Sequence, residues 1–192
     1  MGDVRLPRIR IELPAWAADA VAWQGTYASD EERMRVAIDV ARENVLRDTG
    51  GPFGAAIFEQ ESGRLVALGV NLVVPLDNSA LHAEMVAFMM AQARLGRFTL
   101  GGADQPAHTL YTSCEPCAMC LGATLWAGVR RVLWAATRED ANRIAFDEGP
   151  VFPESYQYLE ARGIAFGAPV LREEGRAVLE LYRDRGGLIY NG

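Results

Sequence analysis

Cysteine is scarce in this chain of 192 residues, which contains only three. A secreted protein held together by disulfides usually spreads an even number of cysteines along its sequence, and this chain lacks that pattern. Instead, Cys114, Cys117 and Cys120 lie in one short segment. Cysteines clustered in this way in an intracellular chain are typical of metal ligands or redox groups.

Long apolar runs are also missing. No stretch of the sequence approaches the length that a membrane-spanning helix needs. The segment from Met1 to Pro14 mixes charged residues with isolated apolar ones, so it lacks the continuous apolar region of a signal peptide. We therefore expect a cytoplasmic protein without a membrane partner.

An excess of basic residues is absent as well. The formal net charge is −6 and the sequence pI is about 5.0. The densest basic clusters are Arg5, Arg8 and Arg10 and the pair Arg130–Arg131, and both are short. Proteins that bind the phosphates of nucleic acids usually carry a basic stripe, so a long nucleic acid is disfavoured as a partner. A local basic patch is still compatible with this composition.

The chain is long and apolar enough, with 50% hydrophobic residues, to bury one sizeable core. We expect an N-terminal arm over residues 1–28, which shows no periodicity, and one domain over residues 29–192. The domain opens with a capping-box pattern, Ser29 followed by Glu32, and apolar residues then recur at helical spacing. We expect strands over 55–59, 65–71, 108–112, 131–136 and 165–171. Besides the first helix, we expect helices over 80–94, 117–127, 138–145, 154–162 and 174–185.

Strands that alternate with helices predict an α/β fold in which helices cover both faces of a sheet. The first two strands are separated by a turn that contains Gly63, which indicates a hairpin. We expect this hairpin to add one antiparallel pair to an otherwise parallel, and therefore mixed, sheet.

A metal site is indicated by His82 together with Cys117 and Cys120. The two cysteines are three residues apart, so they share one face of a helix, and they lie in its first turn, where thiolates are favoured. Two thiolates and one imidazole suit Zn²⁺, and a set of three protein ligands leaves the fourth position open for water, as in catalytic zinc sites. Zinc lowers the pKa of bound water from ~15.7 to ~7, so hydroxide becomes available at neutral pH.

Glu84 is the candidate proton carrier beside this site, and H-x-E…P-C-x-x-C is the signature of zinc deaminases. Residues two apart do not share a helix face, so the motif requires that His82 lie in the first turn of its helix. An iron–sulfur cluster usually needs a fourth thiolate, which the chain lacks, and a redox pair would leave His82 and Glu84 unexplained. We interpret Cys114 as a buried thiol near the site and not as a ligand.

These motifs resemble those of the cytidine deaminase superfamily, and within it those of the guanine deaminases. The resemblance covers about residues 50–192. It implies a three-layer α/β/α sandwich with a five-stranded sheet, and a homodimer whose C-terminal segments, about residues 186–192, are exchanged. The matching segments are GPFGA at 51–55, HAE at 82–84, TSCEPCAMC at 112–120, FDEGP at 146–150 and GLIYN at 187–191.

The resemblance also implies roles for residues around the metal. Asn71 is expected to hydrogen-bond the base, although it could simply end a strand. Phe53 and Trp126 are expected to contact the substrate, and core packing is the alternative for both. Asp147 and Glu148 form an acidic pair that would assist protonation and ammonia release, or would be a solvated turn. Tyr190 in the apolar tail would cover the site of the partner subunit.

The reaction implied by the resemblance is the hydrolysis of guanine to xanthine and ammonia. Cytosine, guanosine and aminotriazines are alternative substrates, because pocket shape decides among them and the sequence does not reveal it. A tRNA adenosine deaminase is less favoured because of the negative net charge. A structural zinc module is the non-enzymatic alternative, and it would normally require a fourth protein ligand.

Overall fold

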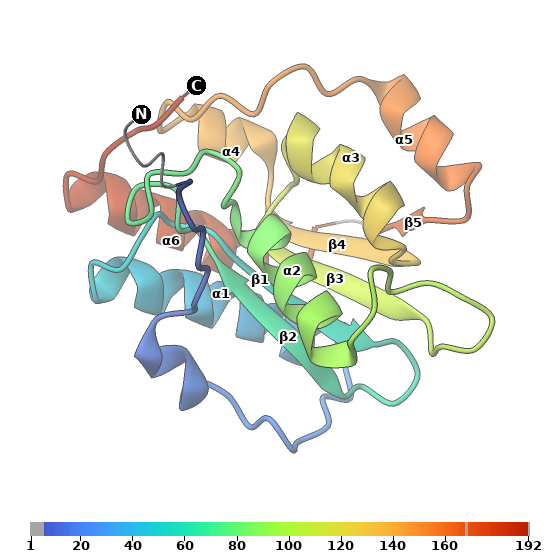
Figure 1. Ribbon diagram of the computed structural model, residues 1–192. Helices are drawn as coiled ribbons and strands as arrows, with labels where there is room; N and C mark the ends of the chain where they lie inside the picture. Colours follow the sequence, from blue (N-terminus) through green and yellow to red (C-terminus); the bar gives the residue numbers. More distant parts are fainter. Residues whose placement is uncertain (1–5, 168, 192) are drawn as a thin grey trace, which may run out of the picture.

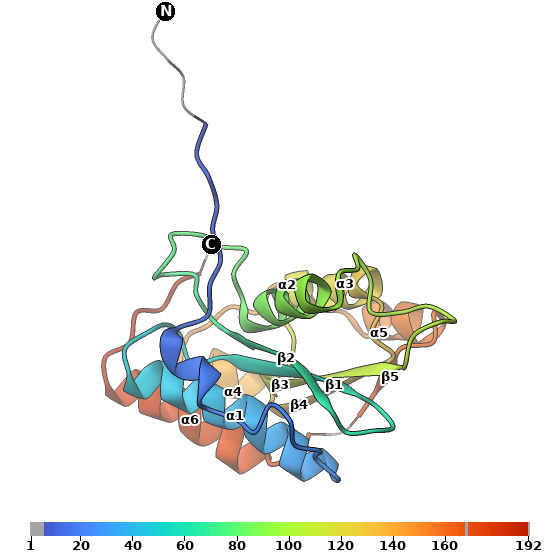
Figure 2. The ribbon, with the colours of Figure 1, turned by 60° about the horizontal axis from the view of Figure 1, so that its bottom comes forward.

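The computed structural model describes residues 6–167 and 169–191. The chain forms one five-stranded sheet with the strand order β2-β1-β3-β4-β5, and helices cover both of its faces (Figures 1 and 2). The expected three-layer α/β/α sandwich with a mixed sheet is therefore confirmed. The strands are β1 (Gly54–Glu59), β2 (Leu65–Val70), β3 (His108–Cys114), β4 (Arg131–Ala136) and β5 (Ala165–Phe166).

The helices divide into two layers. One layer consists of α2 (Ala83–Leu95), α3 (Ala118–Ala127) and α5 (Pro153–Glu160), and the other of α1 (Asp30–Leu46), α4 (Arg138–Asn142) and α6 (Arg172–Asp184) (Figure 2). Each layer packs on the sheet through its own cluster of buried apolar side chains. No helix among the described residues is long and apolar enough to cross a membrane.

The sheet contains more antiparallel pairing than we expected. Strand β1 pairs antiparallel with β2 and also with β3, whereas β3–β4 and β4–β5 are parallel. The expectation of a single antiparallel pair was therefore wrong. The reason is the route of the chain: after β2 it crosses through α2, and β3 then runs in the direction of β2 but lies beside β1.

Two helices start at capping boxes, and the first of these was expected from the sequence. Ser29 and Glu32 form a reciprocal capping box at the start of α1, and Thr137 and Asp140 form one at the start of α4. Helices α2 and α3 begin later than expected: α2 begins at Ala83 and not at residue 80, and α3 begins at Ala118 and not at residue 117. The preceding residue has an extended backbone in both cases, and it acts as the N-cap.

Several other bounds also differ from the expected ones. Helix α4 ends at Asn142, three residues before the expected end, and Ala145 has a positive φ of 72°. Strand β5 is only two residues long. The expected strand over 165–171 includes residue 168, which lies outside the described residues, as do residues 1–5 of the expected arm and residue 192 of the tail.

The second half of the expected N-terminal arm packs on the rest of the chain. It contains a short 3-10 helix, η1 (Ala15–Ala18), and its Thr26 forms an isolated antiparallel bridge with Arg64. The indole Nε1 of Trp16 donates a hydrogen bond to Thr49 Oγ1 at 3.1 Å, just beyond the end of α1. This segment is therefore attached to the helix layer that contains α1.

Candidate active site

The three predicted metal ligands come together at the N-terminal ends of two helices. His82 is the N-cap residue of α2, Cys117 is the N-cap residue of α3, and Cys120 lies in the first turn of α3. Their ligand atoms all lie within 4.8 Å of one another, and Cys117 Sγ is 3.5 Å from His82 Nδ1. Two sulfurs and one imidazole nitrogen at this spacing fit a tetrahedral zinc ion with one open position.

The charges around this cluster favour a thiolate at Cys117. Its pKa is lowered to about 4, first by the hydrogen bond from Cys120 and then, against the cost of burial, by the hydrogen bond from His82. The helix N-terminus adds a partial positive charge at the same place. Burial lowers the pKa of His82, but the Cys117 hydrogen bond and the charge of Glu84 outweigh it, so the net pKa is raised.

Glu84 occupies the position that a proton carrier requires. It is the second residue of α2, directly after the helix start at which His82 serves as the N-cap, so the two side chains can reach the same pocket although they are two residues apart. Only 6% of Glu84 is exposed. Burial raises its pKa to about 7, and the charge of Cys117 adds to the rise. A carboxyl group with a pKa near neutrality can both accept and donate a proton.

The pocket beside these groups is small. It has a volume of about 40 Å³ and opens toward an outer cavity of about 460 Å³. Five residues line both: His82, Cys117, Asp147, Glu148 and Tyr190. The inner pocket brings together nearly all of the predicted site residues, and its lining consists of Phe53, Asn71, His82, Glu84, Cys114, Glu115, Cys117, Phe146, Asp147, Glu148 and Tyr190.

The two acidic residues after α4 have different surroundings. Glu148 is partly buried, and its pKa is raised to about 8 by burial and then by the charges of Cys117 and Glu84. Asp147 is exposed, and its Oδ1 accepts a hydrogen bond from the backbone N–H of Gly149 at 2.9 Å. The carboxyl group of Asp147 therefore stabilises its own turn, whereas that of Glu148 belongs electrostatically to the site.

Asn71 and Phe53 lie on adjoining parts of the wall of the inner pocket. Asn71 is 1% exposed and follows β2, and its backbone N–H donates to the carbonyl oxygen of Phe53 at 3.0 Å. Its side-chain oxygen accepts from the N–H of Val73 at 3.2 Å. The Phe53 ring packs edge-on against Phe146, with ring centroids 5.0 Å apart.

Tyr190 brings the C-terminal tail to the same wall in this chain. Its ring packs edge-on against Phe146, and its buried hydroxyl has no hydrogen-bond partner among the described residues. A side chain at Gly51 would clash with this hydroxyl, so the Tyr190 ring would have to move to accommodate one. The next residue, Asn191, anchors the tail, because its side chain accepts from Asp147 N and donates to Ala145 O, both at 2.9 Å.

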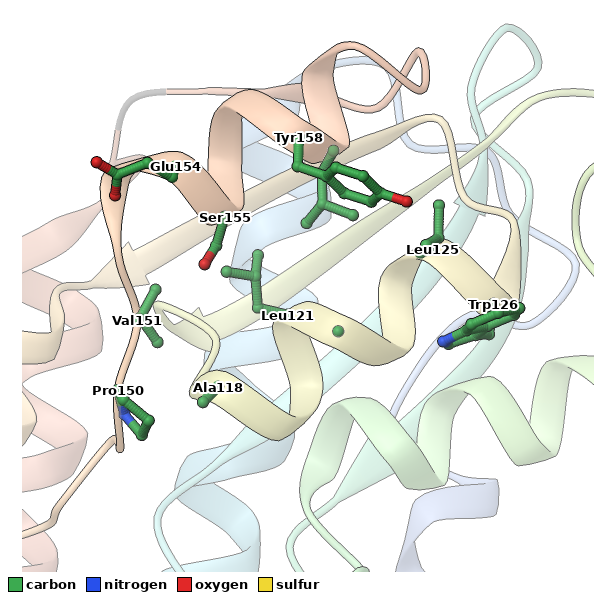
Figure 3. A pocket seen from close by; sticks show the side chains of 11 residues that line it. Ala118, Leu121, Leu125, Trp126, Pro150, Val151, Glu154, Ser155 and Tyr158 are labelled. Atoms are coloured by element: carbon green, nitrogen blue, oxygen red, sulfur yellow. The ribbon is translucent and has the colours of Figure 1, made fainter.

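Trp126 lies apart from the other predicted site residues. It is 80% exposed, which makes the core-packing alternative wrong, and it lines a different cavity of about 430 Å³ between α3 and α5. Figure 3 shows Trp126 at one end of this cavity and Tyr158 across it. Within one chain the structure does not bring Trp126 to the metal ligands.

Cys114 is buried and does not belong to the ligand cluster, as we interpreted it. Its thiol donates a hydrogen bond to the carbonyl oxygen of Thr137 at 3.6 Å. The adjacent Glu115 also lines the pocket, although we did not expect a role for it from the sequence. Glu115 accepts from Tyr156 Oη at 2.7 Å and pairs with Arg138 at 3.1 Å. Its position inside the cysteine motif was the available signal.

Comparisons with known proteins agree with this geometry. Residues 27–136 match the family described as cytidine and deoxycytidylate deaminase zinc-binding region. The chain is 38% identical over 143 residues to the guanine deaminase of Bacillus subtilis (strain 168), which covers 74% of this chain and 87% of that protein.

Two solved structures extend the likeness over almost the whole chain. One is the guanine deaminase from Nitrosomonas europaea, with 41% identity and a TM-score of 0.86 over 92% of this chain and 97% of that one. The other is a complex with 2,6-diaminopurine, with 43% identity and a TM-score of 0.87 over 95% of this chain and 96% of that one.

Proposed function

This chain belongs to the family of zinc-binding cytidine and deoxycytidylate deaminases, and we propose that the base it deaminates is guanine, which it hydrolyses to xanthine and ammonia in purine metabolism. The observation that carries the proposal is the pocket in which buried Glu84 lies beside the ligand cluster. The choice of guanine is supported by the guanine deaminases of 38% and 41% identity and by the purine bound to a relative of 43% identity.

The cofactor is zinc, one ion per chain, and His82, Cys117 and Cys120 are positioned to hold it. When bound, zinc supplies Lewis acidity that makes water a nucleophile at neutral pH. In the proposed reaction, Glu84 takes the proton that water loses when it attacks C2 of guanine and delivers it to N3. Glu84 then takes the second proton from the hydroxyl group now bound to C2 and passes it to the 2-amino group. The C2–N bond breaks as the C2 carbonyl forms, so water and guanine yield xanthine and ammonia.

We assign the remaining wall residues to holding the base. The side-chain amide of Asn71 hydrogen-bonds the purine edge, and Phe53 contacts its ring. Glu148, which follows α4, assists protonation and ammonia release. Asp147 contributes less to these steps, because its carboxylate accepts a hydrogen bond within its own turn. Tyr190 covers the pocket and excludes water from it.

We further propose a cytoplasmic homodimer in which the tail, residues 186–192, is exchanged between subunits. An exchanged segment makes the same contacts that it makes within one chain, so only the hinge must change, and Gly186 has the positive φ of 72° that suits a hinge. Exposed Trp126 and Tyr158 border the cavity between α3 and α5, and a partner subunit would cover such apolar surface (Figure 3).

For the organisation of the chain, we propose an arm over residues 1–28 and a deaminase domain over residues 29–192. The family match, which begins at residue 27, supports this division.

A panel of bases tests the substrate. Purified protein with one zinc per chain is incubated separately with guanine, guanosine, cytosine, adenine and an aminotriazine, and released ammonia is measured. We expect guanine to give the highest kcat/KM, because buried polar groups arranged for one base edge reject analogues by up to ~10⁴–10⁵-fold. Equal turnover of guanine and cytosine would contradict the proposal.

A further inference from the structure

Asn44 is a polar side chain in the core, and it belongs to the buried face of α1. It is fully buried, and its hydrogen-bonding atoms are all used. Its Nδ2 group donates to the carbonyl oxygen of Gly51 at 2.9 Å and to that of Asn71 at 3.0 Å. Its Oδ1 accepts a hydrogen bond from Thr49 Oγ1 at 2.7 Å.

One of these two carbonyl groups belongs to a residue that lines the pocket, Asn71, and the other belongs to Gly51, which lies behind the lining residue Tyr190. Gly51 lies in the loop between α1 and β1, directly against the hydroxyl of Tyr190, and Asn71 follows β2. One side-chain amide therefore joins the loop that leads to Phe53 with the residue proposed to hold the base. The fit is close, because a side chain at Gly50 would clash with both the Asn71 carbonyl oxygen and the Asn44 amide.

Thr49 fixes which way the Asn44 amide faces. An amide group has one accepting and one donating end, and a hydroxyl donor on Oδ1 places Nδ2 toward the two carbonyls. The same hydroxyl oxygen accepts a hydrogen bond from Trp16 Nε1 at 3.1 Å. A connected set of hydrogen bonds thus runs from η1 through Thr49 and Asn44 to the wall of the pocket.

We infer that Asn44 is a positioning residue for the deamination reaction, and that it acts through Asn71 while Thr49 sets its orientation. This inference rests on the proposed role of Asn71 in holding the base. Without the amide, two buried carbonyls lose their donor and the Asn71 backbone is free to shift away from the substrate. The metal ligands lie on other elements and keep their positions.

A pair of substitutions at Thr49 tests the orientation. Thr49→Val has nearly the same shape but no hydroxyl, whereas Thr49→Ser restores the hydroxyl. We expect Thr49→Val to raise the KM for guanine about threefold to tenfold, as for one lost hydrogen bond, with kcat and zinc content close to wild type. Thr49→Ser should return KM to within about twofold of wild type.

The same pair at Thr99 is the matched control. Thr99 is also partly buried and hydrogen-bonded to backbone, but it lies in the loop before β3, at the other end of the sheet. Neither Thr99→Val nor Thr99→Ser should change KM. Equal KM values for Thr49→Val and wild type would overturn the role of Thr49.

A double-mutant cycle tests whether Asn44 acts through Asn71. In the wild-type background, we expect Asn44→Ala to raise KM about tenfold, because its two donated hydrogen bonds are lost. In the Asn71→Ala background, the same substitution should have almost no further effect on KM. Val45→Ala removes a buried neighbour on α1 without touching these hydrogen bonds, so it lowers the melting temperature but should leave KM unchanged. Additive effects of Asn44→Ala and Asn71→Ala, or a KM rise in Val45→Ala equal to that in Asn44→Ala, would overturn the inference.

Failure of the inference about Asn44 can be distinguished from failure of the guanine assignment that the base panel tests. If another base proves to be the substrate, the guanine assignment fails, but the cycle is measured with that base and the expected non-additivity is the same. If Asn71→Ala leaves the KM of the true substrate unchanged, Asn44 has nothing to act through and the inference fails whatever the substrate is. The Thr49 pair remains informative if Asn44→Ala does not fold.

Discussion

The carboxyl group of Glu84 combines burial with closeness to the metal ligands. Changing it to Gln keeps the shape of the side chain and one accepting oxygen but removes its ability to carry protons. We expect Glu84→Gln to retain one zinc per chain and the wild-type melting temperature, and to lose at least ~10²-fold in kcat, the low end of the range for general acid–base catalysis. Metal analysis, thermal denaturation and steady-state kinetics measure these three quantities. A variant that kept a tenth of wild-type activity would show that another group carries the proton.

The neighbouring residues Asp147 and Glu148 allow a matched comparison. Glu148→Gln removes a partly buried carboxyl group from the pocket, so we expect kcat to fall by at least ~10-fold, within what one acid–base group contributes. Asp147→Asn keeps the Oδ1 atom that accepts from Gly149, so kcat should stay within about twofold, as for most surface changes. Steady-state kinetics on both variants show which of the two carboxyl groups contributes to kcat. The reverse ranking would assign the role to Asp147.

At the scale of elements, Asp140 ties α4 to α6. Its side chain is completely buried, caps the start of α4 at Thr137, and pairs with Arg172 of α6 at 2.8 Å. The hydrogen bond from Arg172, followed by the bonds at Thr137, outweighs burial and lowers the pKa of Asp140 to about 2. The charged form of Asp140 therefore stabilises the folded state.

This pKa shift predicts a loss of stability in acid. Because the folded pKa lies below the ordinary value of 3.8, the contribution is full above about pH 4 and disappears as the pH falls toward 2. A shift of this size corresponds to about 2 kcal/mol in the free energy of unfolding. Asp140→Asn should show the deficit at pH 7 and lose most of it near pH 2 in denaturant titrations. A deficit that is independent of pH would contradict the prediction.

The elements differ in how far the sequence predicts them. Capping boxes are visible because both partners lie within one helical turn, as with Ser29 and Glu32. The pairing of β1 with β3 is not visible, because it joins segments about fifty residues apart in the sequence and no local pattern records it. Helix α3 is apolar on nearly every side, so periodicity does not reveal that Trp126 faces outward.

The site shows the same division between local and distant information. His82, Glu84, Cys117 and Cys120 occur in short motifs whose spacing reflects the chemistry, so the sequence predicts them. Asn44 bonds to residues 7 and 27 positions away, and in the sequence it is only a polar residue at helical spacing from the apolar residues Val40 and Ala41. That unusual position on the buried face of a helix was the single signal available.

At the scale of the whole molecule, the tail can be tested for exchange between subunits. Deleting residues 188–192 should sharply reduce activity, because Tyr190 no longer covers the pocket, while zinc remains bound. Mixing this truncated chain with full-length Glu84→Gln should restore part of the activity if the tail is exchanged. The intact Glu84 of one chain then receives the tail of the other.

Verified mixed dimers are needed for this measurement, and differently tagged chains purified in two steps provide them. Homodimers of each variant, treated in the same way, are the controls. A lack of recovery in the mixed dimers would mean that each tail serves its own subunit, which is the arrangement within the chain described here.

The placement of the ligands at the first residues of α2 and α3 has a consequence for how the protein depends on metal. Both helices are held on the sheet by their own buried apolar side chains, such as Val86 and Leu121. Small zinc modules need the ion in order to fold, whereas here these apolar contacts do not involve the ligands, so we expect the protein to fold without zinc. We therefore expect the metal supply to set how many molecules are active but not how many are folded. On this expectation, an apoprotein would be a reserve that becomes active when zinc is restored.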